Sequence, residues 1–76
     1  MYAYGKGVKR DDKESVRWVR KAAEKNFAKA QHRLGYNYEK GVGVKKSEQE
    51  AVKWYRKAVE QGFGPAEASL NKLLDQ

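Results

Sequence analysis

The feature that most constrains this chain is an internal repeat with a spacing of 36 residues. Residues 16–27 read VRWVRKAAEKNF, and residues 52–63 read VKWYRKAVEQGF. Alignment of the sequence with itself at this offset pairs 39 positions, of which 15 are identical. Self-similarity with a period of roughly 20–50 residues indicates a solenoid, because one copy cannot bury its apolar face without another beside it.

Each period predicts two helices and no strand. In the complete copy, Ala30, Leu34 and Tyr38 are four residues apart and form one apolar stripe on a first helix, which ends at the glycines of KGVG. A second helix follows and ends at Gly62. Its inward positions are Ala51, Val52, Tyr55, Ala58 and Val59. We call these the first-type and second-type helices, and no segment shows strand alternation, so the sequence predicts an all-α fold.

Capping residues support these helices. Ser47 is the predicted N-cap of the second helix, and Glu50 three residues later predicts a capping box. In the earlier copy Asp11 and Glu14 take these two positions, and Asn26 takes the terminating position of the glycine.

A third first-type helix begins near Pro65 and is predicted to end the array. Asn71 stands where the preceding copy has Gly35, so the register departs from the repeat. The apolar face of this helix is formed by Ala66, Leu70, Leu73 and Leu74. We therefore interpret it as a cap. The expected organisation of residues 1–76 is one repeat domain, divided into a partial first repeat at 1–27, a full repeat at 28–63 and a capping helix at 64–76.

The beginning of the chain predicts an uncovered edge. Tyr2 aligns with Tyr38, so the chain opens at the last turn of a first-type helix, and the helix carrying Trp18 lacks its usual partner. Large exposed apolar patches are rare in monomers. We expect either a fragment of a longer array or a homo-oligomer that assembles through this edge near Trp18.

The residues of the full copy resemble the SEL-like (Sel-one-like) repeat family, a relative of the tetratricopeptide repeats. The matching positions are Ala30, Leu34, Gly35, Tyr38, Gly41, Gly43, Val44, Ala51, Trp54, Tyr55, Lys57, Ala58, Glu60 and Gly62. The first copy departs mildly, at Ser15, Val19 and Asn26. The resemblance implies a short right-handed α-solenoid of antiparallel helix pairs that acts as a non-catalytic adaptor for protein or peptide partners. Such repeats are common in bacterial proteins, both cytoplasmic and exported, and also occur in the eukaryotic machinery for endoplasmic-reticulum degradation. Because no signal peptide or membrane span is recognised in the sequence, we expect the bacterial cytoplasm.

The composition excludes several classes of site. Cysteine is absent, so the chain can form neither a disulfide framework nor a thiolate metal site. No apolar run approaches the ~20 residues of a membrane span, and the basic start has no apolar stretch behind it, unlike a signal peptide. His32 beside Arg33 is a poor metal ligand and is interpreted as a surface histidine. No serine has a base spaced to activate it, so we expect no catalytic, cofactor or metal site.

The candidate binding residues lie on the first helix, opposite its apolar stripe. They are Lys29, His32, Arg33, Tyr36, Asn37 and Lys40. First helices line the concave surface in tetratricopeptide-like stacks, so these side chains are predicted to face a groove. Arginine can clamp a carboxylate, and asparagine can bond a peptide backbone. This pattern predicts an acidic peptide or protein segment as the partner, while an ordinary solvated helix face stays open as the competing interpretation.

The formal net charge of +7 allows a second function, because clustered Lys and Arg bind phosphate backbones. The cluster comprises Lys6, Lys9, Arg10, Lys13, Arg17, Arg20 and Lys21, and then Lys45, Lys46, Lys53, Arg56 and Lys57. Acidic residues are interleaved with them, and no recognition helix or stacking platform accompanies the charge. Non-specific binding of nucleic acid or another polyanion is therefore the alternative rather than the main prediction. No membrane partner is expected.

Overall fold

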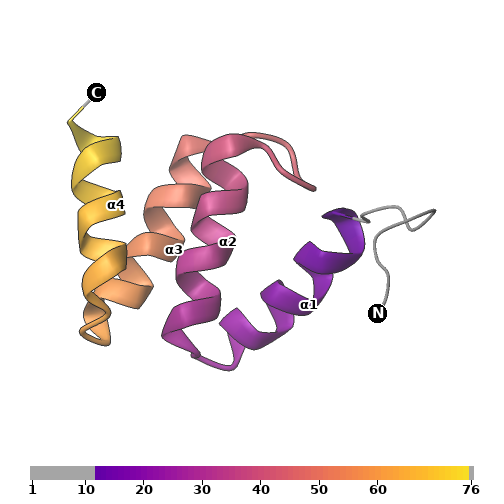
Figure 1. Cartoon of the computed structure of the whole chain (residues 1–76), viewed down its shortest axis with the longest axis horizontal. Helices are drawn as coiled ribbons and strands as arrows, with labels where there is room; N and C mark the ends of the chain where they lie inside the picture. Colours follow the sequence, from indigo (N-terminus) through magenta and orange to yellow (C-terminus); the bar gives the residue numbers. More distant parts are fainter. Residues whose placement is uncertain (1–11, 76) are drawn as a thin grey trace, which may run out of the picture.

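The computed structural model describes residues 12–75, which fold into four helices. These are α1 (Asp12–Glu24), α2 (Ala28–Lys40), α3 (Glu48–Glu60) and α4 (Gly64–Leu74). They follow one another across the molecule, so that α1 and α4 lie at opposite ends (Figure 1). The predicted all-α repeat solenoid is confirmed: α2 and α4 are first-type helices, and α1 and α3 are second-type helices. Among residues 12–75, no helix is long and apolar enough to cross a membrane.

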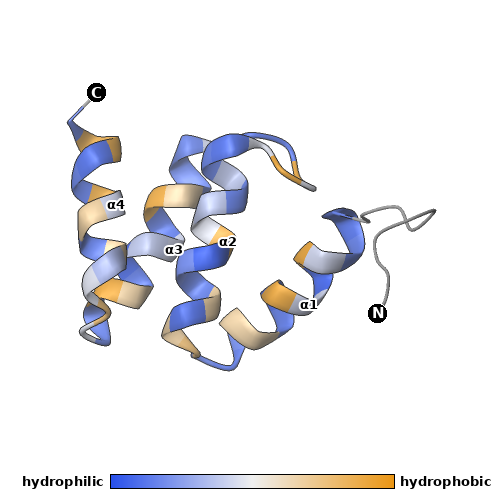
Figure 2. Cartoon of the chain, in the orientation of Figure 1, coloured by the Kyte–Doolittle hydropathy of each residue, from blue (hydrophilic) through white to orange (hydrophobic). Residues whose placement is uncertain are grey.

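Two apolar clusters hold the helices together. The first joins α1, α2 and α3 and consists of Val16, Ala23, Leu34 and Trp54. The second joins α3 to α4 and consists of Ala51, Tyr55, Leu70 and Leu73. Tyr38 of α2 contacts both clusters. Apolar residues occupy only part of each helix surface, and the remainder is hydrophilic (Figure 2).

A glycine sets the spacing between α2 and α3. A methyl group added at Gly35 would lie 2.6 Å from two ring carbons of Tyr55 and 3.2 Å from the carbonyl oxygen of Ala51. Glycine is therefore the residue that lets the two helices approach this closely.

The residues that begin and end the helices are those that the sequence predicted, with one difference in the hydrogen bonds of the α3 N-cap. Asn26, Gly41 and Gly62 all have positive φ, of 74°, 73° and 82°. The Ser47 hydroxyl accepts a hydrogen bond from the Glu50 N–H at 3.2 Å, as an N-cap does. A capping box also requires the Glu50 side chain to accept a hydrogen bond from the Ser47 N–H. This part of the prediction is wrong, because the Ser47 N–H donates instead to the Tyr38 carbonyl at 2.9 Å. That bond ties the α2–α3 connection back onto α2. The expected cap Asp11 lies outside the described residues.

The last helix only partly matches its expected apolar face. Ala66, Leu70 and Leu73 are buried, the two leucines in the cluster shared with α3, but Leu74 is 55% exposed. Leu74 is the repeat equivalent of Tyr38, which lies between two helices, whereas α4 has a neighbour on one side only among residues 12–75. The interpretation of α4 as the end of the array stays a prediction.

Candidate interaction site

A hollow of about 560 Å³ lies between α1 and α2. We call it the α1–α2 hollow, and it is lined by Asp12, Ser15, Val16, His32, Arg33, Tyr36, Asn37 and Val42. Gly43 packs its loop against α1, since a methyl group there would lie 2.4 Å from the Asp12 carbonyl oxygen. Its φ is +75°, in the region that favours glycine. This close packing places the neighbouring Val42 in the wall of the hollow.

The structure brings together four of the six predicted groove residues. His32, Arg33, Tyr36 and Asn37 all line the α1–α2 hollow. Lys29 lines a neighbouring hollow with Arg33. Lys40 lines neither and instead lies 3.8 Å from the Glu39 carboxylate.

The wall that α1 and the loop contribute was not predicted. It consists of Asp12, Ser15, Val16 and Val42. The signal that could have found it is the glycine pair of KGVG, because a glycine with positive φ often marks a close backbone approach.

Arg33 and Tyr36 form the exposed rim of the hollow. The Arg33 guanidinium lies 5.9 Å from the centre of the Tyr36 ring, and both side chains are exposed. No carboxylate of residues 12–75 lies within ion-pair distance of Arg33. The guanidinium can therefore donate hydrogen bonds to an incoming carboxylate without first breaking an ion pair within this part of the chain.

Asn37 lies deeper than predicted. It was expected on the exposed face of α2, but it is only 2% exposed and lines the hollow from within. Its backbone carbonyl accepts the N–H groups of Gly41 and Val42, at 2.8 and 2.9 Å. None of the hydrogen bonds found among residues 12–75 engages its side-chain amide. A buried amide in this position is a donor and acceptor for a ligand that enters the hollow.

His32 is not a surface histidine, and this prediction was wrong. Its ring is half-buried, 5.5 Å from the rings of both Tyr55 and Phe63, and Nε2 lies 3.0 Å from the Ser69 hydroxyl. Burial lowers the pKa of His32 below 6.5, and the nearby Glu39 carboxylate offsets part of that effect. The neutral ring is therefore favoured at neutral pH.

The contact with Ser69 corrects the expectation that no serine has a base beside it. A serine–histidine pair needs a third group to orient the ring before it acts as a nucleophile and base. Among residues 12–75, the His32 ring has its one hydrogen bond to Ser69 and no such orienting group. The pair links α2 to α4.

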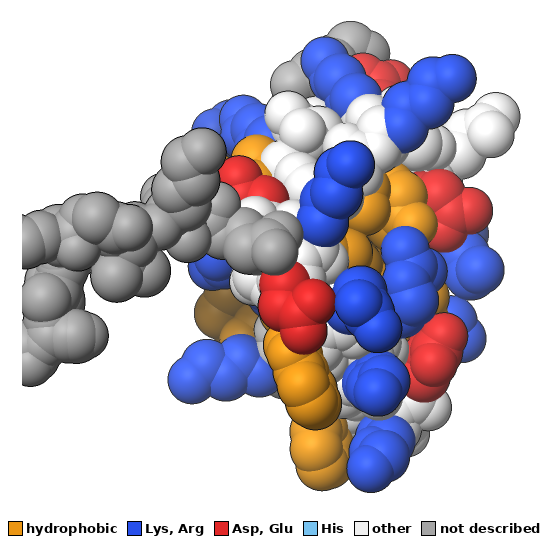
Figure 3. Space-filling model, turned by 90° about the vertical axis from the view of Figure 1, so that its right-hand side faces the viewer, with side chains coloured by type: hydrophobic (Ala, Val, Ile, Leu, Met, Phe, Trp, Pro, Cys, Tyr) orange, Lys and Arg blue, Asp and Glu red, His pale blue; other side chains and the backbone are white. Residues whose placement is uncertain are grey.

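A second surface lies beside the first, over α1 and the start of α2. A hollow of about 540 Å³ here is lined by Ser15, Val19, Phe27, Lys29, Ala30 and Arg33, and we call it the α1 edge. Phe27 is exposed, and Trp18 nearby along α1 is 63% exposed. Lysine and arginine side chains surround hydrophobic ones at this end of the molecule (Figure 3).

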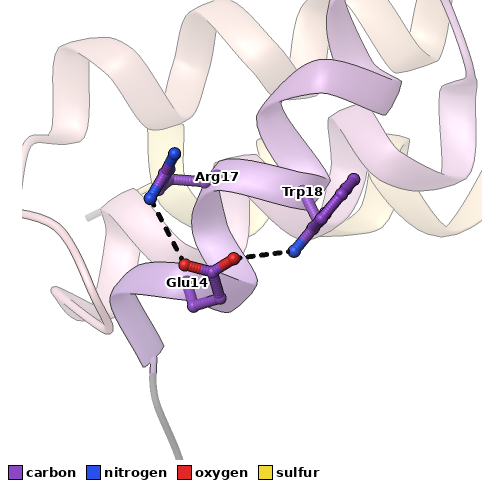
Figure 4. Close-up of polar contacts among 3 residues, drawn as sticks. All are labelled: Glu14, Arg17 and Trp18. Carbon is purple, nitrogen blue, oxygen red and sulfur yellow. Dashed lines mark hydrogen bonds and ion pairs between the residues drawn. The ribbon is translucent and has the colours of Figure 1, made fainter.

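Glu14 organises the polar contacts of Trp18. Its carboxylate accepts the Trp18 Nε1–H at 3.0 Å and the Arg17 guanidinium at 3.3 Å, so the three side chains form one group on α1 (Figure 4). The Lys21 ammonium lies 5.1 Å from the centre of the Trp18 ring. Sequence reasoning assigned Glu14 to a capping box, whereas its spacing of four residues from Trp18 could have predicted this pairing.

A third hollow, of about 370 Å³, lies between α1 and α3. Arg20, Lys53 and Lys57 line it together with Trp54 and two glutamates. Lys53 and Lys57 lie 5.4 and 5.8 Å from the centre of the Trp54 ring. The Arg20 guanidinium also bonds the Tyr38 hydroxyl, so part of the predicted basic cluster joins α1 to α2.

No cluster suited to a metal ion is present in the part of the chain that the structure describes. Within residues 12–75, no three His, Cys, Asp or Glu side chains are grouped to hold one.

Comparison with known proteins gives the family. The sequence model of the Sel1 repeat matches residues 1–27 and 28–63. The chain belongs to the Sel1 repeat family. It is similar to the crystal structure of a Sel1 repeat protein from Oxalobacter formigenes, with 51% sequence identity and a TM-score of 0.83. That match covers 88% of this chain and 28% of the other, so this chain spans less than a third of that relative's length. No curated protein matches. Sel1 repeats generally mediate protein–protein interactions.

Proposed function

We propose that this Sel1 repeat protein is a non-catalytic interaction module that holds an acidic peptide or protein segment in the α1–α2 hollow. The observation that carries this proposal is the placement of Arg33 and Asn37. The Arg33 guanidinium is exposed at the rim and has no ion pair within residues 12–75. The Asn37 amide lines the interior, and none of the hydrogen bonds within the same residues engages it.

The two groups suit different parts of one ligand. Arg33, stacked on Tyr36, presents a planar fork that a glutamate or aspartate carboxylate matches with two hydrogen bonds. The Asn37 amide can donate to and accept from a peptide backbone in the same segment. His32 is fixed by its contacts with Ser69 and Phe63, so it supplies a rigid wall.

The other wall limits which segments fit. Asp12 and Ser15 face the same hollow from α1. A ligand carboxylate is therefore favoured on the Arg33 side and disfavoured beside Asp12. The overall charge of +7 favours encounter with an acidic partner.

The test is selection of eight-residue peptides by the immobilised chain from a displayed random library, at physiological salt. We expect selected sequences to be enriched in Asp and Glu. Binding of the best peptide, measured by isothermal titration, should be abolished by Arg33→Glu and weakened about tenfold or more by Asn37→Ala. Lys72→Glu is the matched control, because Lys72 is exposed on α4 outside the hollow and the change in net charge is the same.

Two results would contradict the proposal. One is equal loss of binding in the Arg33→Glu and Lys72→Glu variants, since only net charge would then matter. The other is a set of chemical-shift changes, on titration with the peptide, that leaves the Asn37 side-chain amide unmoved.

The second candidate function is polyanion binding by the basic surface. Arg20, Lys53 and Lys57 line the α1–α3 hollow, which favours this idea locally. Glu24 and Glu50 line the same hollow and oppose it. Binding of a single-stranded oligonucleotide that collapses between about 50 and 200 mM salt would identify this as a non-specific electrostatic interaction.

A further inference from the structure

The α1 edge has a covered counterpart inside the same molecule. Its positions Ser15, Val19, Phe27 and Ala30 are the repeat equivalents of Ala51, Tyr55, Phe63 and Ala66. In the second repeat, α2 packs over three of those equivalents: Gly35 lies against the Tyr55 ring and the Ala51 carbonyl oxygen, and His32 lies against Tyr55 and Phe63. The α1 edge therefore has the shape of a surface that receives a first-type helix.

The first-type helix with an open face is α4. It lies at the end of the molecule opposite α1 (Figure 1). On α2, the residues that meet α3 include His32, Gly35 and Tyr38; their equivalents on α4 are Ala68, Asn71 and Leu74, all exposed. We propose that copies of this chain associate head to tail, with α4 of one copy packed on the α1 edge of the next.

The sizes of the facing residues complement each other across this joint. Within one copy, α2 needs Gly35 because the bulky Tyr55 ring faces it. Across the joint the equivalent pair is Asn71 and Val19. The larger residue on the first-type helix thus meets the smaller residue on the second-type helix, so the two changes offset one another.

One pair of exposed residues also has opposite charges across the joint. Within one copy, the Gln61 side-chain amide donates to the Gln31 side-chain oxygen at 2.9 Å. Across the joint the equivalents are Lys25 of one copy and Glu67 of the other, both exposed in the single chain. A neutral hydrogen bond is replaced by a pair of opposite charge, as expected of two surfaces that bind each other.

The proposed joint would also bury Trp18. Its equivalent Trp54 is buried against Val16 and Ala23 of the preceding second-type helix. Across the joint those two residues become Val52 and Val59 of α3 in the adjoining copy, which are half-buried. A hollow of about 520 Å³ lined in part by Val52 is open on that face of α3. The joint would cover the most exposed aromatic side chain of residues 12–75.

The two faces of this joint differ, so the association does not close at a dimer. Each copy offers α4 at one end and the α1 edge at the other, and a heterologous contact of this kind continues into a ring or an open chain. The weight-average mass should therefore keep rising with concentration instead of reaching a plateau at two copies.

The first test is sedimentation velocity of the full chain at physiological salt, from about 10 µM to about 1 mM. We expect the weight-average mass to rise across this range. Trp18→Ala should weaken association at least about tenfold, because a large aromatic contact is removed from the joint. Trp18 is exposed in the single chain, so the circular dichroism spectrum and Tm of the variant should stay those of the unmodified chain.

A charge exchange makes the test specific to the proposed partner faces. Lys25→Glu and Glu67→Lys should each weaken association about fivefold, and an equimolar mixture of the two variants should restore it. Lys45→Glu, a substitution of the same charge on the exposed α2–α3 loop, should leave it unchanged. Two results would overturn the proposal: a chain that stays monomeric up to about 1 mM, or a mixture of the two variants that does not associate more strongly than either variant alone. The α1 edge would then be covered by a flanking repeat or by another protein.

Discussion

Substitution of Gly35 by alanine tests whether the α2–α3 contact is as close as the structure indicates. The added methyl group would lie 2.6 Å from two ring carbons of Tyr55, well inside van der Waals contact. The ring cannot easily move aside, because Tyr55 is fully buried and its hydroxyl donates to the Glu39 carboxylate at 2.7 Å. Burial, with the hydrogen bond to Glu39, raises the pKa of Tyr55 above its usual range, so this donor persists at neutral and moderately alkaline pH. The helices must therefore separate.

Two opposing effects set the size of the change. Alanine is favoured over glycine in a helix interior by up to about 1 kcal/mol. Overpacking of a well-filled core costs about 1–3 kcal/mol, and two contacts at 2.6 Å against a fully buried ring place this site in the upper part of that range. We expect a net loss of about 1–2 kcal/mol in the free energy of unfolding, since the packing cost exceeds the gain in helix propensity. For a chain of this size that corresponds to a fall in Tm of about 5–15 °C.

The assay is urea unfolding followed by far-ultraviolet circular dichroism. Gly64→Ala is the matched control: it also adds a methyl group to a helical glycine, but apart from the adjacent residues of the chain nothing lies within 4 Å of the new atom. Gly64→Ala should cost less than Gly35→Ala, because only the following Pro65 constrains the new methyl group. A Gly35→Ala variant as stable as the unmodified chain would refute the argument.

A double-mutant cycle then assigns the cost to its cause. Tyr55→Val removes the ring and reproduces the residue found at the equivalent Val19. In that background Gly35→Ala should no longer destabilise the chain, which gives a coupling of about 1–2 kcal/mol. An unchanged cost of Gly35→Ala would show that the Tyr55 ring is not its source.

Three further predictions concern the loops and pH. In urea unfolding, Gly43→Ala should lower the free energy of unfolding by at least about 1 kcal/mol more than Gly62→Ala does. Both glycines have positive φ, but only the methyl group at Gly43 would meet the backbone of another helix. Equal losses would argue against the close packing of the loop on α1. Ser47→Ala should lower stability by about 1 kcal/mol in the same assay, because the α3 N-cap bond is lost, and Ser47→Asp should retain most of it. The pKa of His32 is lower in the folded chain than its unfolded value of 6.5, because burial disfavours the charged ring. The neutral ring therefore contributes its full stabilisation above pH 6.5, and this stabilisation is lost as the pH falls through the folded pKa. We expect Tm to fall below pH 6.5 and His32→Gln to reduce that fall; identical profiles of Tm against pH for the unmodified chain and the variant would contradict the prediction.

The candidate site shows where sequence reasoning succeeded and where it stopped. Arg33 and Tyr36 could be placed on the exposed side of α2 because helical spacing fixes which residues share a face. Asn37 and His32 were placed on that face too, yet one lies buried toward the hollow and the other is held by Phe63 and Ser69. Their burial depends on where the neighbouring helices lie, which the spacing within α2 does not specify.

The sequence by itself determined the all-α fold, the period of the repeat and the helix ends. These features depend on local chemistry: apolar spacing, an N-cap at Ser47, and positions such as Asn26 and Gly41 where the backbone takes positive φ. Only the tertiary structure decided that α1 forms a wall of the hollow, that Asn37 lies inside it, and that Ser47 bonds Tyr38. Those outcomes depend on the distances and angles between helices, which packing fixes only when Gly35, Gly43 and the aromatic residues opposite them meet in three dimensions.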